Sequence, residues 1–114
     1  MPSIFNVNKS FTQADGEVEV VTPSYDDSCT QVSFKTDSTT GTLAVYAKYH
    51  PDADKEPILE EDGTTPLVVN LASDNHTFQL FDKWVYSFVF VPTSVNNTYT
   101  PLVASGEIYR TRLA

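Results

Sequence analysis

The sequence predicts an all-β fold, an antiparallel β-sandwich. Apolar and polar residues alternate with period two along much of the chain, as they do in strands that bury one face. No helical period continues beyond two turns. Residues that favour tight turns separate the alternating stretches. Short strands with such turns between them are typical of β-sandwiches and small barrels.

The first half of the chain contains three alternating stretches. In residues 17–21, acidic residues alternate with valines, so one strand face meets water and the other is buried. Residues 31–35 repeat this pattern, and residues 42–49 form the longest stretch of the three. One side of that stretch collects Leu43, Val45, Ala47 and Tyr49. We expect each of the three to form a strand.

The second half predicts five more strands, in residues 66–71, 77–81, 83–91, 98–104 and 107–113. The stretch 83–91 is apolar on both faces, with Trp84 and Phe88 on one and Val89 on the other. It therefore predicts a central strand that is covered on both sides, either by another sheet or by a partner subunit. Pro101 predicts an edge strand or a bulge at its position, because proline lacks the N–H that a sheet ladder uses.

The expected turns lie between these stretches, at residues 15–16, 38–41, 61–64, 96–97 and 105–106. A chain of 114 residues fits one domain, so we expect residues 1–114 to form a single sandwich. Its expected type is immunoglobulin-like or jelly-roll-like, with about seven to nine short strands. Residues 1–14 are expected to act as an N-terminal arm that contacts partners.

The composition excludes several classes of function. The net charge of -8 and the pI near 4.4 argue against unaided binding to nucleic acid and to anionic membranes. Cys29 is the only cysteine, which excludes an internal disulfide and a CxxC redox pair. The sequence shows neither a signal-peptide pattern nor an apolar run long enough to span a membrane. We therefore expect a chain made in the cytoplasm.

The sequence offers no catalytic constellation. His50 and His76 both fall at strand ends or in turns, where a surface histidine is the simpler interpretation. There is no G-x-S-x-G turn, no phosphate-binding glycine loop and no H-E-x-x-H pair. We therefore expect no enzyme activity, no catalytic residue and no cofactor. A small hydrolase stays as a third class, which would require one of the histidines to lie near a buried acid.

Residues 52–62 carry six acidic residues in eleven positions. Asp52, Asp54 and Glu56 have the alternate spacing that can present oxygens to calcium, and they are weak metal-ligand candidates. Against this, Pro57 stands where a calcium-binding loop has glycine, and Lys55 would oppose a cation. A solvated loop without metal is the preferred interpretation. Such a negative patch can also meet a basic partner surface.

Aromatic residues and the chain ends supply the candidates for contact with partners. The tyrosines are too numerous for so small a core, and tyrosine is enriched in protein interfaces. The alternative for any single tyrosine is cross-strand pairing on a half-exposed sheet. The interface candidates are Ile4, Phe5, Tyr25, Tyr46, Tyr49, Tyr99, Tyr109, Arg110 and Arg112.

Residues 41–49 and 83–94, with the turn at 96–99, resemble the small all-β virion proteins of tailed bacteriophages. The resemblance covers roughly residues 41–106 and implies a capsid decoration (cement) protein that stabilises the head. Such a protein binds the major capsid protein, and copies of itself as a dimer or trimer, on the outer capsid surface of the virion. It needs no nucleic acid, membrane or cofactor.

The alternative function is a carbohydrate- or receptor-binding β-sandwich of a phage fibre or a cell-surface protein. This function would require an exposed tryptophan or tyrosine on a flat sheet face, for stacking against sugars. A buried Trp84 would count against it.

Overall fold

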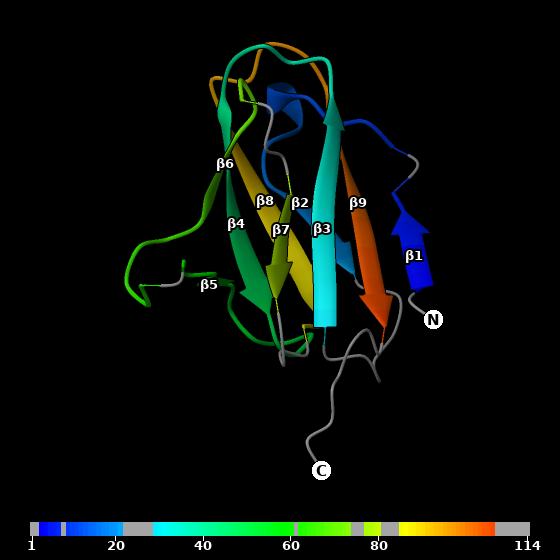
Figure 1. Ribbon diagram of the computed structural model, residues 1–114, viewed down its shortest axis with the longest axis vertical. Helices are drawn as coiled ribbons and strands as arrows, with labels where there is room; N and C mark the ends of the chain where they lie inside the picture. The colour runs from blue at the N-terminus through cyan, green and yellow to red at the C-terminus, as the bar shows by residue number, and fades with distance from the viewer. Residues whose placement is uncertain are drawn as a thin grey trace.

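The computed structural model describes residues 3–7, 9–21, 29–60, 62–73, 77–80 and 85–106, which form an antiparallel β-sandwich (Figure 1). These segments contain one short 3-10 helix, η1 (Gln13–Asp15), and nine strands. The strands are β1 (Ser3–Asn6), β2 (Val18–Val21), β3 (Cys29–Thr36), β4 (Thr42–Lys48), β5 (Glu56–Pro57), β6 (Val68–Asn70), β7 (Thr77–Leu80), β8 (Ser87–Thr93) and β9 (Tyr99–Gly106). The predicted fold class and strand number are confirmed.

The strands form two sheets. One has four strands in the order β1-β9-β3-β7, and the other has five, in the order β2-β8-β4-β5 with β6 also paired to β4. All pairs are antiparallel. Strands that are distant in the sequence therefore lie side by side, as β1 and β9 do in Figure 1.

The core lies between the sheets and follows from the alternation in the sequence. Leu43, Val45 and Ala47 of β4 are buried in it, as the spacing of the stretch predicts. Phe34 of the four-stranded sheet meets Phe90 of the five-stranded sheet edge to face, with 5.4 Å between ring centroids. Burying one such aromatic side chain contributes roughly 2–3 kcal/mol.

β8 is a central strand, as its double apolar character predicts, because β2 and β4 flank it. Phe88 and Phe90 are buried in the core, and Val89 between them is also buried although it faces the opposite side. The strand begins at Ser87, later than predicted. Trp84 lies outside the described residues.

The expectation of an edge strand or bulge at Pro101 is wrong. β9 lies between β1 and β3, and Pro101 pairs with Phe34 in an unbroken register. The backbone N–H and C=O of Tyr99 point away from β3 and form two 2.9 Å hydrogen bonds with the backbone of Phe11. Pro101 is two residues further along the strand, so its backbone nitrogen also points away from β3. Pairing with β1 starts only at Leu102, so the proline nitrogen faces a gap in the ladder.

Other departures concern the ends of elements. β1 pairs with β9, so residues 3–6 are part of the sandwich and not a free arm. Residues 105–106, expected to turn, belong to β9. Tyr49 lies just beyond β4 and is exposed, unlike Leu43, Val45 and Ala47, with which it shares a side in the alternation. The strand expected at 107–113 lies outside the described residues.

The loops at one end of the sandwich are tied together by side-chain hydrogen bonds. The Asn96 side chain accepts from the backbone N–H of Thr39 at 3.0 Å and donates to its hydroxyl at 2.9 Å. The Asp37 carboxylate accepts from the backbone and the hydroxyl of Thr98, and these bonds lower its pKa. Turn residues at 38–41 and 96–97 therefore lock two loops to each other.

Candidate protein-interaction face

The register of β4 defines an outer face on the five-stranded sheet. Because Leu43, Val45 and Ala47 point into the core, Ala44 and Tyr46 between them point outward. Their partners across the sheet share this direction. Ala44 pairs with Val91 of β8 and Val68 of β6, and Tyr46 pairs with Val89 and Pro57. Val21 of β2 faces outward as well, since Val18 and Val20 are in the core.

This surface is unusually apolar for the outside of a sandwich. We call it the valine face, and it consists of Val21, Ala44, Tyr46, Val68, Val89 and Val91. A row of Val91, Ala44 and Val68 runs across three neighbouring strands, with no charged side chain between them. The outer faces of antiparallel sheets are usually polar. The row therefore needs an explanation beyond the fold.

One half of the valine face is covered by the chain itself. The Nζ of Lys55 lies 5.4 Å from the centroid of the Tyr46 ring and 3.2 Å from Glu17 Oε2. Tyr46, on β4, and Glu19, on β2, flank Val89 on both sides. These long side chains explain why Val89 is buried outside the core.

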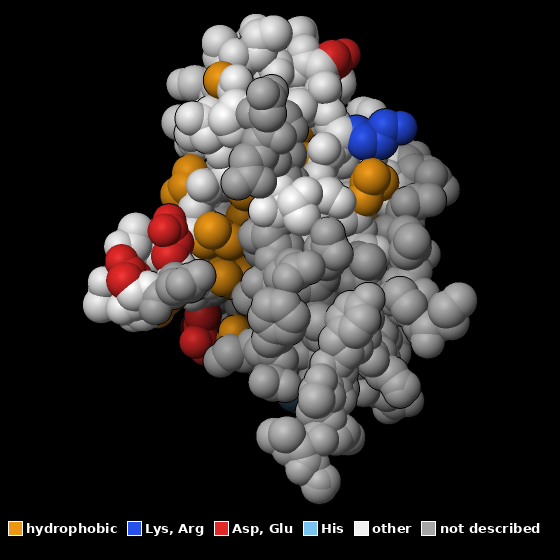
Figure 2. Space-filling model, viewed as in Figure 1, with side chains coloured by type: hydrophobic (Ala, Val, Ile, Leu, Met, Phe, Trp, Pro, Cys, Tyr) orange, Lys and Arg blue, Asp and Glu red, His pale blue; other side chains and the backbone are white. Residues whose placement is uncertain are grey.

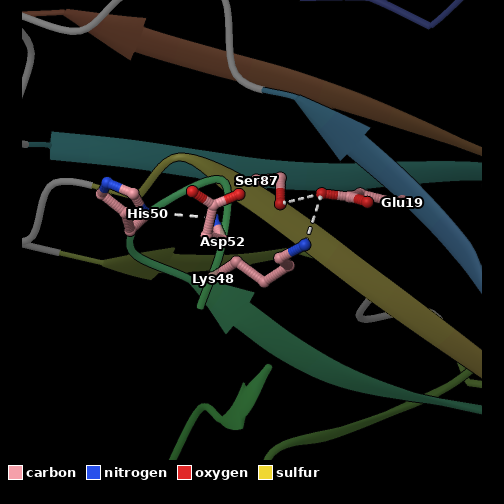
Figure 3. A network of polar contacts seen from close by, with 5 residues as sticks. All are labelled: Glu19, Lys48, His50, Asp52 and Ser87. Carbon is pink, nitrogen blue, oxygen red and sulfur yellow. Dashed lines mark hydrogen bonds and ion pairs between the residues drawn. The ribbon is translucent and has the colours of Figure 1, made fainter. Parts of the chain in front are cut away.

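A polar cluster borders this covered half (Figure 3). The Ser87 hydroxyl donates to Glu19 Oε2 at 2.6 Å, and Lys48 Nζ lies 3.6 Å from the same oxygen. Ser87 is fully buried, so its hydroxyl needs a hydrogen-bond partner, and the Glu19 carboxylate provides it. His50 stands apart at the end of β4, where its Nδ1 accepts from the backbone N–H of Asp52 at 3.1 Å. Both residues are exposed, which fits the expected surface histidine.

The other half of the valine face is open. Val68 is 46% exposed, while Ala44 and Val91 are half-buried. Val21, which is 40% exposed, pairs with Ser87 and lies at the other end of the face, beyond Glu19 and Tyr46. Leu59, which follows the buried Ile58, is 44% exposed. These are among the large apolar side chains that the described segments leave in contact with solvent.

A hairpin of residues 58–67, here called the acidic hairpin, projects from the edge of β4 beside this open half (Figure 1). Its base is held where Ile58 donates to Val45 at 3.2 Å and Leu67 donates back to Ile58. At its tip Asp62 Oδ1 accepts from the backbone N–H groups of Thr64 and Thr65, both at 2.8 Å. Hydrogen bonds from Thr65 and then Thr64 lower the pKa of Asp62 to about 2.

The charge on this side of the molecule is negative. Within the described residues, ion pairs join Lys48 to Glu19 and Lys55 to Glu17. Glu56, Glu60 and Asp62 are exposed and have no cation among their recorded contacts in these segments. Figure 2, a view onto the four-stranded sheet, shows acidic side chains on the projecting hairpin, and its blue Lys or Arg atoms lie on the opposite flank.

The predicted contact tyrosines have different positions. Tyr46 belongs to the valine face, and Tyr49 is 38% exposed. Burial and then the nearby charge of Glu56 raise the pKa of Tyr49. The assignment of Tyr99 to a partner surface is wrong, because its side chain is 0% exposed and packs beside Phe11 in the core. Tyr99 lies in β9, which pairs with neighbours on both edges, and its ring points toward the opposite sheet, so the side chain is enclosed by the core.

The remaining candidates are less fully placed. Ile4 and Phe5 lie in β1 and pair with Ala104 and Val103 of β9. Tyr25, Tyr109, Arg110 and Arg112 lie outside the described residues. In the part of the chain that is described, Asp52, Asp54 and Glu56 do not come together with other ligand residues as a group able to hold a metal ion. That part also contains no helix long and apolar enough to cross a membrane.

The open apolar row was missed by the sequence analysis. The stretch 83–91 showed that β8 is apolar on both faces and left open whether another sheet or a partner subunit covers the second face, but it did not show which neighbouring residues share that face. The small side chain of Ala44 and the short strand around Val68 carry little signal alone. They become one surface only when β4 places Ala44 between Val68 and Val91.

Comparison with solved structures shows one clear likeness in fold. The chain is similar to the SPBc2 prophage-derived protein YomS, with a TM-score of 0.62 and 15% sequence identity. The likeness covers 92% of this chain and 92% of that chain. No protein-family model matches the sequence, and no curated protein sequence does either. At this level of identity the likeness concerns the fold, and it supports the predicted β-sandwich.

Proposed function

We propose that the chain is a non-enzymatic structural protein of a bacteriophage particle, and more narrowly a capsid decoration protein that binds the major capsid protein. The observation that carries this proposal is a likeness in fold to a prophage-derived protein that extends over 92% of each chain. The resemblance of residues 41–106 to small virion proteins points the same way. In this role the protein sits on the outer capsid surface, is made in the host cytoplasm, and uses neither cofactor nor direct contact with nucleic acid.

The open half of the valine face supports a role in binding another protein. An exposed apolar row with a charged border is typical of protein–protein interfaces. A carbohydrate-binding function has less support, because sugar stacking needs an exposed aromatic face. Tyr46, the aromatic residue of the valine face, is half-buried and has the Lys55 ammonium over its ring.

Binding to particles tests the proposal directly. Purified protein is mixed with heads of the encoding phage assembled without it, and the mixture is sedimented. We expect saturable co-sedimentation and a higher temperature of DNA release from the decorated heads. If the protein stays in the supernatant and the release temperature is unchanged, the decoration function is wrong. A polysaccharide pull-down run in parallel identifies the alternative function.

A further inference from the structure

We propose that the open half of the valine face, together with the acidic hairpin, is the surface that docks on the particle. The partner it fits is a protein surface that presents a strip of aliphatic side chains bordered by lysine or arginine. This inference rests on the proposed function and specifies which of the two outer sheet faces makes the contact.

Val91, Ala44 and Val68 form the apolar part of the docking surface. On the covered half of the same face, the long side chains of Tyr46 and Lys55 lie over the sheet and Val89 is buried. Outward apolar residues there are therefore shielded from solvent by the chain itself. In the open row the apolar residues pair with one another, Val91 and Val68 on either side of Ala44, and Val68 is 46% exposed. An aliphatic strip of the partner would complete its burial, at about 25 cal/mol for each Å² of apolar area.

The exposed acidic residues beside this row favour a partner with a cationic border. The two lysines on this side are already paired with Glu17 and Glu19, so the exposed acids of the hairpin side dominate the field. A second copy would bring the same unpaired hairpin acids to the border of the interface, and like charges across an interface are unfavourable. A cationic border on the partner removes this repulsion and speeds association at low salt.

The main test compares two single substitutions in the particle-binding assay. Val68→Glu places a carboxylate in the open row, on the edge strand β6. Thr77→Glu is its matched control, because Thr77 is also exposed on an edge strand, β7, but lies in the other sheet. We expect Val68→Glu to weaken particle binding by about tenfold or more, since it buries an unpaired charge, and Thr77→Glu to leave binding within about twofold. Thermal unfolding of both variants checks that they fold.

A second pair of substitutions tests the charge argument and does not depend on the first. Glu56→Gln with Glu60→Gln removes two exposed charges whose side chains form no ion pair with a lysine of the described segments. We expect weaker binding at low salt, and a shallower loss of affinity as salt rises, because fewer charges are screened. Asp62 is left intact because it builds the turn.

The outcomes separate the two proposals. If the wild-type protein does not bind particles, the decoration function is wrong and the docking surface falls with it. If the wild type binds and Val68→Glu binds equally well, the docking surface is wrong while the decoration function stands. If light scattering shows a wild-type dimer that Val68→Glu converts to monomer, with particle binding unchanged, the face belongs to a second copy and the inference is overturned.

Discussion

Tyr99 is a core side chain whose buried hydroxyl lowers the stability of the fold. The ring fills space beside Phe11, at 5.9 Å between centroids, and is fully buried. Its hydroxyl is buried too, with no hydrogen-bond partner among the described residues. Burial, and then the charge of Asp15, raises the pKa of Tyr99 to about 12. A buried polar atom without a partner lowers stability by its lost hydration.

Replacing Tyr99 by phenylalanine removes that atom and keeps the ring. We expect the free energy of unfolding of Tyr99→Phe to rise by about 1 kcal/mol, because a desolvated hydroxyl without a partner is lost. Urea denaturation measures the change. Tyr49→Phe is the control, since Tyr49 is partly exposed, and its stability should stay the same. A clear loss of stability in Tyr99→Phe would mean that the hydroxyl has a partner in solution.

Turns and hairpins depend on particular backbone dihedral angles, which two glycines of this chain provide. Gly41 precedes β4 with a φ of 103°, and a Cβ built there would lie 2.7 Å from the Val95 Cα. Gly63, in the tip of the acidic hairpin, has a φ of 77° and nothing within 4 Å. Both positions favour glycine for its freedom at positive φ, but only Gly41 is also confined by a neighbouring loop.

These two glycines form a matched pair for a stability experiment. Gly41→Ala should lower the free energy of unfolding by about 2–4 kcal/mol, because it combines unfavourable φ with a backbone clash. Gly63→Ala should cost only about 1 kcal/mol, from φ alone. Thermal unfolding of both variants measures the difference. Equal losses would show that the loops at 38–41 and 94–96 separate easily.

The acidic hairpin predicts a pH dependence. The folded pKa of Asp62 is about 2, below its ordinary 3.8, so the carboxylate form stabilises the hairpin. This contribution is fully present above pH 3.8 and is lost as pH falls toward 2. We expect the NMR signals of Thr64 and Thr65 to titrate with a midpoint near pH 2. In Asp62→Ala the same signals should not titrate there; a midpoint near 4 in the wild type would contradict the hydrogen bonding.

At the scale of the whole molecule, the four-stranded sheet brings together segments from the two ends of the described chain. β1 starts at Ser3, β9 ends at Gly106, and the two pair over four residues. Phe11 then bridges to Tyr99 and continues the contact. The N-terminal segment therefore contributes to the stability of the sandwich, whatever else it contacts.

Deleting residues 1–7 tests this contribution. The deletion exposes the edge of β9, and we expect the unfolding temperature to fall by roughly 5 °C or more, because about 1 kcal/mol shifts the midpoint of a small domain by several degrees. The exposed edge should also promote association between chains. Circular dichroism and light scattering measure both effects. A free arm would leave the unfolding temperature unchanged.

The alternation of side chains determined most of the fold. The stretches around residues 17–21, 31–35 and 42–49 formed strands with alternating buried residues, although the last strand ends before Tyr49, because period two is a local property of the backbone. The acidic residues of 52–62 were likewise expected to lie in contact with water, and the described ones do.

Only the tertiary structure decided which surfaces are inside and which outside. Alternation says that a strand has two faces, but the order of strands in the sheets decides what lies against each. Strand order placed Tyr99 in the core, gave Pro101 a gap in a central strand, and joined Val68, Ala44 and Val91 into one exposed row. Such contacts join residues far apart in the sequence, and no local pattern records them.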